Sequence, residues 1–141
     1  MDYVYRATFT ADPEGGYLVT FADVPEAITQ GDDLADALAS GREALGLALR
    51  GVLADGRDLP QPSASEGVAV AVEPETALKL AVILAFREAN ISKTELARRL
   101  GKGETEARRI LDADHGTKAG LLTEALRALG RDVVISVRAA A

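Results

Sequence analysis

Basic and hydroxyl side chains gather between Ser92 and Arg109, at spacings that suit contact with nucleic acid. An arginine can donate two parallel hydrogen bonds to guanine, whereas lysines and amides at a helix start bind phosphate oxygens. This pattern predicts a DNA-binding surface in the second half of the chain. Its candidate contact residues are Ser92, Lys93, Thr94, Lys102, Thr105, Arg108 and Arg109.

Two short helices must position these side chains. Ser92 and Glu95 form the pattern of a capping box, in which the Ser92 hydroxyl accepts from the Glu95 amide and the Glu95 carboxylate reaches back to the Ser92 amide. Gly101 then suits the left-handed residue of a tight turn. A second helix is predicted over Glu104 to Asp112. Together these features indicate a helix-turn-helix whose second helix lies in the major groove.

This motif departs from the usual pattern in its turn and at the start of its second helix. Lys102 stands where an apolar residue is usual, and Gly103 is a weaker cap than Ser or Thr. Glu104 and Glu106 also bring negative charge near the phosphates. We therefore expect a modest DNA contact that depends on two copies acting together.

The two halves of the chain differ in charge. Residues 1–73 hold 13 Asp and Glu against 4 Lys and Arg, a net charge of −9. Residues 74–141 hold 9 acidic and 12 basic residues, a net charge of +3. The first half should therefore repel nucleic acid, whereas the second half tolerates it.

Composition limits the remaining chemistry. There is no cysteine, so neither a disulfide framework nor a thiolate metal site is possible. His115 is the one histidine and cannot form a metal site alone. No metal and no cofactor are expected. The sequence shows no run long enough for a membrane span, and its acidic, alternating start differs from a signal peptide. We expect a cytoplasmic protein.

The predicted first domain covers residues 1–73 in the order β-β-β-α-β. Strands over 3–10 and 17–21 form a hairpin, and a third strand lies near 27–30. A helix over 34–53 follows, capped by Asp32 or Asp33, with Gly41 as a close-packing position and an apolar stripe that includes Leu34. A linker rich in Pro and Ser, at about 55–66, leads to a strand over 68–72.

The predicted second domain covers residues 74–141. A very apolar helix over 75–89 precedes the helix-turn-helix, and a helix over 118–129 ends at Gly130. Residues 132–138 read as a strand without a partner, which predicts pairing with a second copy and hence a homodimer, whose dimers could assemble into tetramers. The fold class is α+β.

The order of motifs resembles the HicB family of antitoxins over nearly the whole chain. One departure is Glu26-Ala27, where the family usually has Gly-Cys. The matching stretches are Gly15 to Phe21, Asp23-Val24-Pro25, Thr29 to Asp32, Glu43-Ala44-Leu45, Ile91-Ser92, Leu96 to Gly101, Arg109 to Asp112, Asp114-His115 and Ala128 to Arg131.

The resemblance implies both a fold and two binding partners. It implies a first domain with a partial RNase H-like fold that neutralises a HicA-type toxin, a small basic protein that cleaves messenger RNA. It also implies a second domain of the XRE/Cro-like helix-turn-helix type, which binds operator DNA and represses the operon of the pair. An acidic domain suits a basic partner. The toxin-contacting residues are not fixed, and Asp23, Asp32 and Asp33 are candidates. No enzymatic activity is expected.

Two alternatives remain open. The first is an RNase H-like nuclease, in which carboxylates converge on Mg²⁺, although most of them fall in turns or a helix cap. The second is a stand-alone transcriptional regulator that senses a small molecule in an aromatic pocket. The residues concerned are Asp2, Asp12, Glu14, Asp23, Asp32 and Asp33 for the nuclease, and Tyr3, Tyr5, Phe9 and Tyr17 for the pocket.

Overall fold

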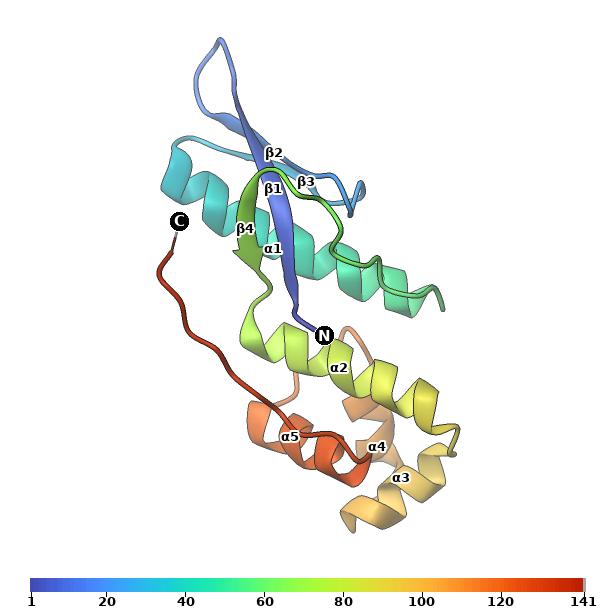
Figure 1. Cartoon of the computed structure of the whole chain (residues 1–141). Helices are drawn as coiled ribbons and strands as arrows, with labels where there is room; N and C mark the ends of the chain where they lie inside the picture. Colours follow the sequence, from blue (N-terminus) through green and yellow to red (C-terminus); the bar gives the residue numbers. More distant parts are fainter. Residues whose placement is uncertain (141) are drawn as a thin grey trace. The chain divides into compact units, whose positions relative to one another are not determined.

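The computed structural model describes residues 1–140, which form two compact units, Met1–Glu73 and Pro74–Ala140 (Figure 1). The first unit is an antiparallel sheet of four strands in the order β3-β2-β1-β4, with one helix. The predicted α+β class and the β-β-β-α-β order are confirmed. The elements are β1 (Val4–Ala11), β2 (Tyr17–Phe21), β3 (Ile28–Gly31), α1 (Leu34–Ala54) and β4 (Val68–Ala71).

Helix α1 covers one face of this sheet, as Figure 1 shows. Alternate residues of the strands point toward the helix because successive side chains of a strand leave opposite faces. Tyr5 and Ala7 of β1 pair with Val70 and Phe21 of the neighbouring strands, and all four are buried. They meet a stripe on α1 that includes Leu45, Leu49 and Val52.

The closest approach of α1 to the sheet depends on small residues. Gly41 is buried, and a Cβ there would lie 3.3 Å from Cγ1 of Val19, so the predicted close-packing position is confirmed. Ala37 takes the inward position one turn earlier, directly over Gly31. Leu34 is 57% exposed, so its predicted place in the buried stripe is wrong.

The segment between α1 and β4, which includes the predicted linker, makes specific contacts with the rest of the first unit. Leu59 is buried, and the Tyr5 hydroxyl donates a hydrogen bond of 2.7 Å to the Pro60 carbonyl. Burial raises the pKa of Tyr5 to about 12. Arg57 forms an ion pair with Glu26 at 3.0 Å. Contacts with residues more than 30 positions away in sequence hold this segment in place.

The second unit is a bundle of four helices. Helix α5 packs against each of the other three, and their contacts enclose a common core. Val82, Leu96, Ile110 and Leu122 each supply a fully buried side chain, one from each helix. In the part of the chain that the structure describes, no helix is long and apolar enough to cross a membrane. The helices are α2 (Pro74–Ala89), α3 (Lys93–Leu100), α4 (Glu104–Leu111) and α5 (Ala119–Ala128).

The chain after Gly130 does not form the strand predicted over 132–138. Val133 packs against the core of the second unit, but Val134, Ile135 and Val137 are 91%, 79% and 92% exposed. A strand requires a neighbouring strand to satisfy its backbone N–H and C=O groups, and within residues 1–140 this segment pairs with none. Within a single chain the strand prediction is therefore wrong.

The tight contact at Gly31 should make this position intolerant of a larger residue. A Cβ at Gly31 would lie 2.3 Å from the Ala37 nitrogen, so Gly31→Ala must displace the start of α1 and should lower the free energy of unfolding by about 1–3 kcal/mol. Gly51→Ala is the matched control. Its Cβ meets nothing within 4 Å, and alanine in a helix is favoured over glycine by up to ~1 kcal/mol.

Tyrosine fluorescence during urea denaturation measures this difference, because the three tyrosines, Tyr3, Tyr5 and Tyr17, all lie in the first unit and the chain has no tryptophan. Equal midpoints for the two variants would show that the backbone at Gly31 can move at little cost.

Candidate functional site

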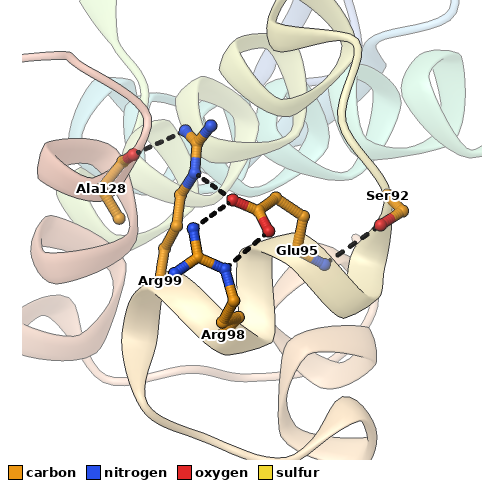
Figure 2. A network of polar contacts seen from close by, with 5 residues as sticks. All are labelled: Ser92, Glu95, Arg98, Arg99 and Ala128. Carbon is orange, nitrogen blue, oxygen red and sulfur yellow. Dashed lines mark hydrogen bonds and ion pairs between the residues drawn. The ribbon is translucent and has the colours of Figure 1, made fainter.

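Helix α3 begins at a side-chain cap that the sequence predicts only in part. The Ser92 Oγ accepts a hydrogen bond of 3.0 Å from the Glu95 amide, as expected (Figure 2). The Glu95 carboxylate does not close the predicted capping box. It accepts instead from Arg98 at 2.6 and 2.8 Å and from Arg99 at 3.1 Å. A charged donor forms a stronger hydrogen bond with a carboxylate than a backbone amide does, so the arginines prevail.

Arg99, one of the two arginines bonded to Glu95, also connects α3 to the end of α5. Arg99 donates a second hydrogen bond, of 3.2 Å, to the Ala128 carbonyl in the last turn of α5 (Figure 2). A cation at a helix C-terminus satisfies a free carbonyl and complements the helix dipole. Hydrogen bonds from Arg98 and Arg99 lower the pKa of Glu95 to about 2. The two arginines therefore have a structural role within the unit.

The turn between α3 and α4 explains how the motif tolerates Lys102. Gly101 adopts φ 66° and ψ 33°, the left-handed conformation expected there. Its amide donates to the Arg98 carbonyl at 3.1 Å, and the Lys102 amide donates to the Ala97 carbonyl at 2.9 Å. This pair of hydrogen bonds is a Schellman motif. Because backbone atoms form it, the half-buried Lys102 side chain does not have to be apolar.

The start of α4 is held by a side chain of α3. Gly103 has no side chain with which to cap the helix, as the sequence predicts. The Thr94 hydroxyl donates to the Glu104 carboxylate in the first turn of α4. Two of the predicted DNA contacts, the hydroxyls of Ser92 and Thr94, thus take part in hydrogen bonds that hold the two helices.

The other predicted contacts remain available on the surface. Lys93, Thr105, Arg108 and Arg109 are exposed, while Ala107 and Ile110 turn the opposite face of α4 into the core. Within residues 1–140, the side chains of Lys93, Lys102, Thr105, Arg108 and Arg109 form no hydrogen bond or ion pair. Helix α4 therefore presents cationic side chains on its exposed face.

One buried charge escaped the sequence reasoning. Lys79 is the third of the ten residues from Ala77 to Phe86, the other nine of which are apolar, and in the structure it is 4% exposed. The signal was present, because a lone lysine in an apolar helix is either on the surface or paired. Its position could not be decided without knowing which groups lie opposite it.

The first unit carries carboxylates at the end where the β1–β2 turn meets the start of α1. A Cβ at Gly16 would lie 2.7 Å from the Gly31 carbonyl oxygen, so the turn and this corner are in contact. Asp33 caps α1 by accepting from the Asp36 amide at 2.8 Å, and Asp36 accepts from the Asp32 amide at 2.9 Å. We call Asp12, Glu14, Asp32, Asp33 and Asp36 the acidic end.

Asp23, the other candidate for toxin contact, has a structural role elsewhere. Its two carboxylate oxygens accept from the Ala64 amide at 2.9 Å and from the Ser63 hydroxyl and amide at 2.8 and 2.9 Å. These hydrogen bonds lower the pKa of Asp23. They attach the segment before β4 to the turn after β2.

The positions of these carboxylates and aromatic side chains give little support to the RNase H-like nuclease or to the ligand-sensing regulator. Among residues 1–140, no three acidic or histidine side chains are placed to hold a metal ion, as the nuclease would require. Tyr5, one of the aromatic residues suggested for a ligand pocket, is completely buried and its hydroxyl is bonded to Pro60.

The low pKa of Glu95 predicts an acid-sensitive α3. A carboxyl group whose pKa is lower in the folded state stabilises that state above its ordinary pKa of 4.5, and this contribution disappears as the pH falls toward about 2. Amide exchange at Leu96 and Ala97, followed against pH, should therefore show protection falling over this range. Glu95→Gln should be less protected at neutral pH and should lose this component of the pH dependence. Identical acid curves for the two proteins would contradict the prediction.

Comparison with known proteins identifies the family. The family described as HicB_like antitoxin of bacterial toxin-antitoxin system matches residues 4–81. Antitoxin HicB of Escherichia coli K12 is 37% identical over 131 residues, covering 92% of this chain and 95% of that protein. Antitoxin HicB 1 of Photorhabdus laumondii is 34% identical over 133 residues, covering 94% and 86%, respectively. The match to these relatives extends across both units. The chain belongs to the HicB-like antitoxin family.

Proposed function

We propose that this chain neutralises a small basic HicA-type toxin that cleaves messenger RNA and binds operator DNA to repress the operon of the pair. The observation that carries the proposal is the division of charge between the two units. Residues 1–73 have a net charge of −9, whereas the second unit presents Arg108 and Arg109 on α4 without acidic partners within residues 1–140. Each unit suits a partner of opposite charge, and both partners would meet in the cytoplasm.

The acidic end supports the toxin-binding half of the proposal. Its carboxylates surround the start of α1, where Leu34 is 57% exposed. An exposed apolar residue with a charged rim is a common arrangement in protein interfaces. A protein that binds RNA must carry a cationic surface, and carboxylates can occupy the positions of the RNA phosphates on such a surface. We assign Asp32 and Asp33 to this contact, since Asp33 uses only its Oδ1 to cap α1. We exclude Asp23, because both of its carboxylate oxygens accept internal hydrogen bonds.

The α3–α4 pair supports the DNA-binding half. In a helix-turn-helix the second helix enters the major groove and the first lies across the backbone. Here Thr105 and Arg108 on α4 would face the bases, and Lys93 at the start of α3 would face a phosphate. Few cations are available in each copy, because Arg98 and Arg99 are bonded to Glu95. Binding should therefore require two copies on two half-sites.

The C-terminal segment offers a way to join these copies. Residues 132–138 have exposed backbone groups and three strongly exposed β-branched side chains, Val134, Ile135 and Val137. Pairing with the same segment of a second chain would satisfy the backbone and cover these side chains. We propose that the homodimer forms in this way.

The decisive experiment separates the two halves. Arg108→Ala combined with Lys93→Ala should abolish a gel shift of the promoter DNA, because one base contact and one phosphate contact are lost, each worth about 1–3 kcal/mol if well placed. The double variant should still co-purify with the product of the neighbouring toxin gene and suppress its toxicity. Arg127→Ala is the control, because this exposed arginine on α5 lies outside the predicted contact set. A normal DNA shift by the double variant would exclude α4 as the reading helix.

Strand pairing can be tested without disturbing the core. Ile135→Pro removes an amide donor from a residue that is 79% exposed, and Val133 keeps its contact with the core. Sedimentation should show a shift from dimer toward monomer, together with weaker DNA binding. Ile135→Thr, which retains the amide and a β-branched side chain, should remain closer to the parent protein. An unchanged dimer in the proline variant would rule out pairing through this segment.

A further inference from the structure

Lys79 lies inside the second unit with all three of its N–H donors engaged. Its Nζ donates to the carbonyl oxygens of Arg109 at 3.0 Å and Ile110 at 2.8 Å, and to the Thr117 hydroxyl at 2.7 Å. It is the one charged side chain that is buried among residues 1–140. Removing a charge from water is costly, so a buried lysine must have partners that compensate for the loss.

The partners of Lys79 belong to the end of the candidate reading helix. Arg109 and Ile110 are near the C-terminus of α4, where the last carbonyls of a helix lack partners within the helix. The positive charge of Lys79 also faces the negative end of the helix dipole. Because α4 has only eight residues and Gly103 has no side chain to cap it, this contact stabilises the C-terminus of a short helix whose start is held by the Thr94–Glu104 hydrogen bond.

The same ammonium group joins three elements. Lys79 itself comes from α2, whose neighbours Leu80 and Val82 lie in the core. Thr117 lies in the segment that leads from α4 to α5. The position of the α4 C-terminus is therefore fixed relative to α2, and Arg109, which offers its side chain to solvent, is bonded to Lys79 through its own carbonyl.

We propose that Lys79 is a positioning residue for DNA recognition, which sets the orientation of α4 and of its exposed arginines without touching DNA. The proposal rests on the proposed DNA-binding function. It predicts that removing one buried cation, on a helix that does not belong to the motif, disturbs recognition as strongly as removing a contact.

The charges near Lys79 provide a distinctive test. Asp112 at the end of α4 favours the ammonium, Glu75 lies one turn earlier on α2, and the His115 Nδ1 lies 3.5 Å from the Thr117 hydroxyl. Desolvation outweighs the attraction of Asp112 and lowers the pKa of Lys79 to about 8. Above this pH a neutral amine has two N–H donors for three acceptors, so one contact to α4 or Thr117 is lost.

Stability and DNA binding should then change in opposite directions. The folded pKa lies below the ordinary value of 10.5, so the unfolded chain binds more protons between about pH 8 and pH 10.5. The contribution of Lys79 to the free energy of unfolding therefore increases as the pH rises through this window. DNA affinity should decrease as the pH rises through about 8, because the contact that orients α4 is weakened. A lysine that served only the stability of the fold would not weaken DNA binding while stability increased.

The experiment uses the full chain, the DNA fragment upstream of its own gene, and Lys79→Met. Lys118→Met is the matched control, because it removes the same charge from an exposed position of the same unit. Lys79→Met should weaken DNA binding by about tenfold or more, as expected for the loss of one well-placed arginine contact. It should also accelerate amide exchange at Arg109 to Leu111. Lys118→Met should change both only slightly.

Wild-type DNA affinity should also fall as the pH rises through about 8, without a lower urea midpoint, and Lys79→Met should have a flatter profile. Thr117→Val, which removes one acceptor, provides a milder variant if Lys79→Met does not fold, and should accelerate the same amides. Equal DNA affinity and equal exchange in Lys79→Met and the parent protein would overturn the proposal. Absence of DNA binding in the parent protein would refute the proposed function, while exchange would still test whether Lys79 positions α4.

Discussion

Helices of eight residues are too short to persist alone in water, so α3 and α4 depend on the contacts made at their ends. Ser92 caps the first helix, the left-handed Gly101 ends it, and Thr94 connects it to Glu104 at the start of the second. Lys79 completes the far end of α4. The exposed surface of this unit can carry the residues that a partner needs, because the interior and the helix ends maintain its shape.

The sequence predicts most of what is local and little of what is distant. The hairpin, the Asp33 and Ser92 caps and the left-handed Gly101 depend on residues a few positions apart, and they form as expected. The contacts that escaped prediction join distant positions. Tyr5 bonds to Pro60, and Lys79 bonds to Ile110. The capping box failed for a related reason, since two arginines compete for one carboxylate and their geometry decides the outcome.

The candidate site shows the same division. Composition alone places acidic residues in the first unit and basic residues in the second, and this contrast supports the assignment of partners to units. It does not separate side chains available for binding from those already bonded within the protein. Asp23, Ser92 and Thr94 have the right chemistry for contact but use it internally. Arg108 and Arg109 differ from Arg98 and Arg99 only in what lies beside them.

The anchoring of Val133 in the core has a geometric consequence for any paired assembly. The chain leaves the helical unit from a fixed point, and its exposed residues begin directly afterwards, at Val134. If two such segments pair, their register fixes the distance between the two α4 helices. A slip of two residues would keep the same side chains on the same face but would move one α4 helix relative to the other by about 7 Å along the strand direction, which is about two base pairs of DNA. The spacing of operator half-sites would then be set by the pairing register of this short tail, far from the residues proposed to read the bases.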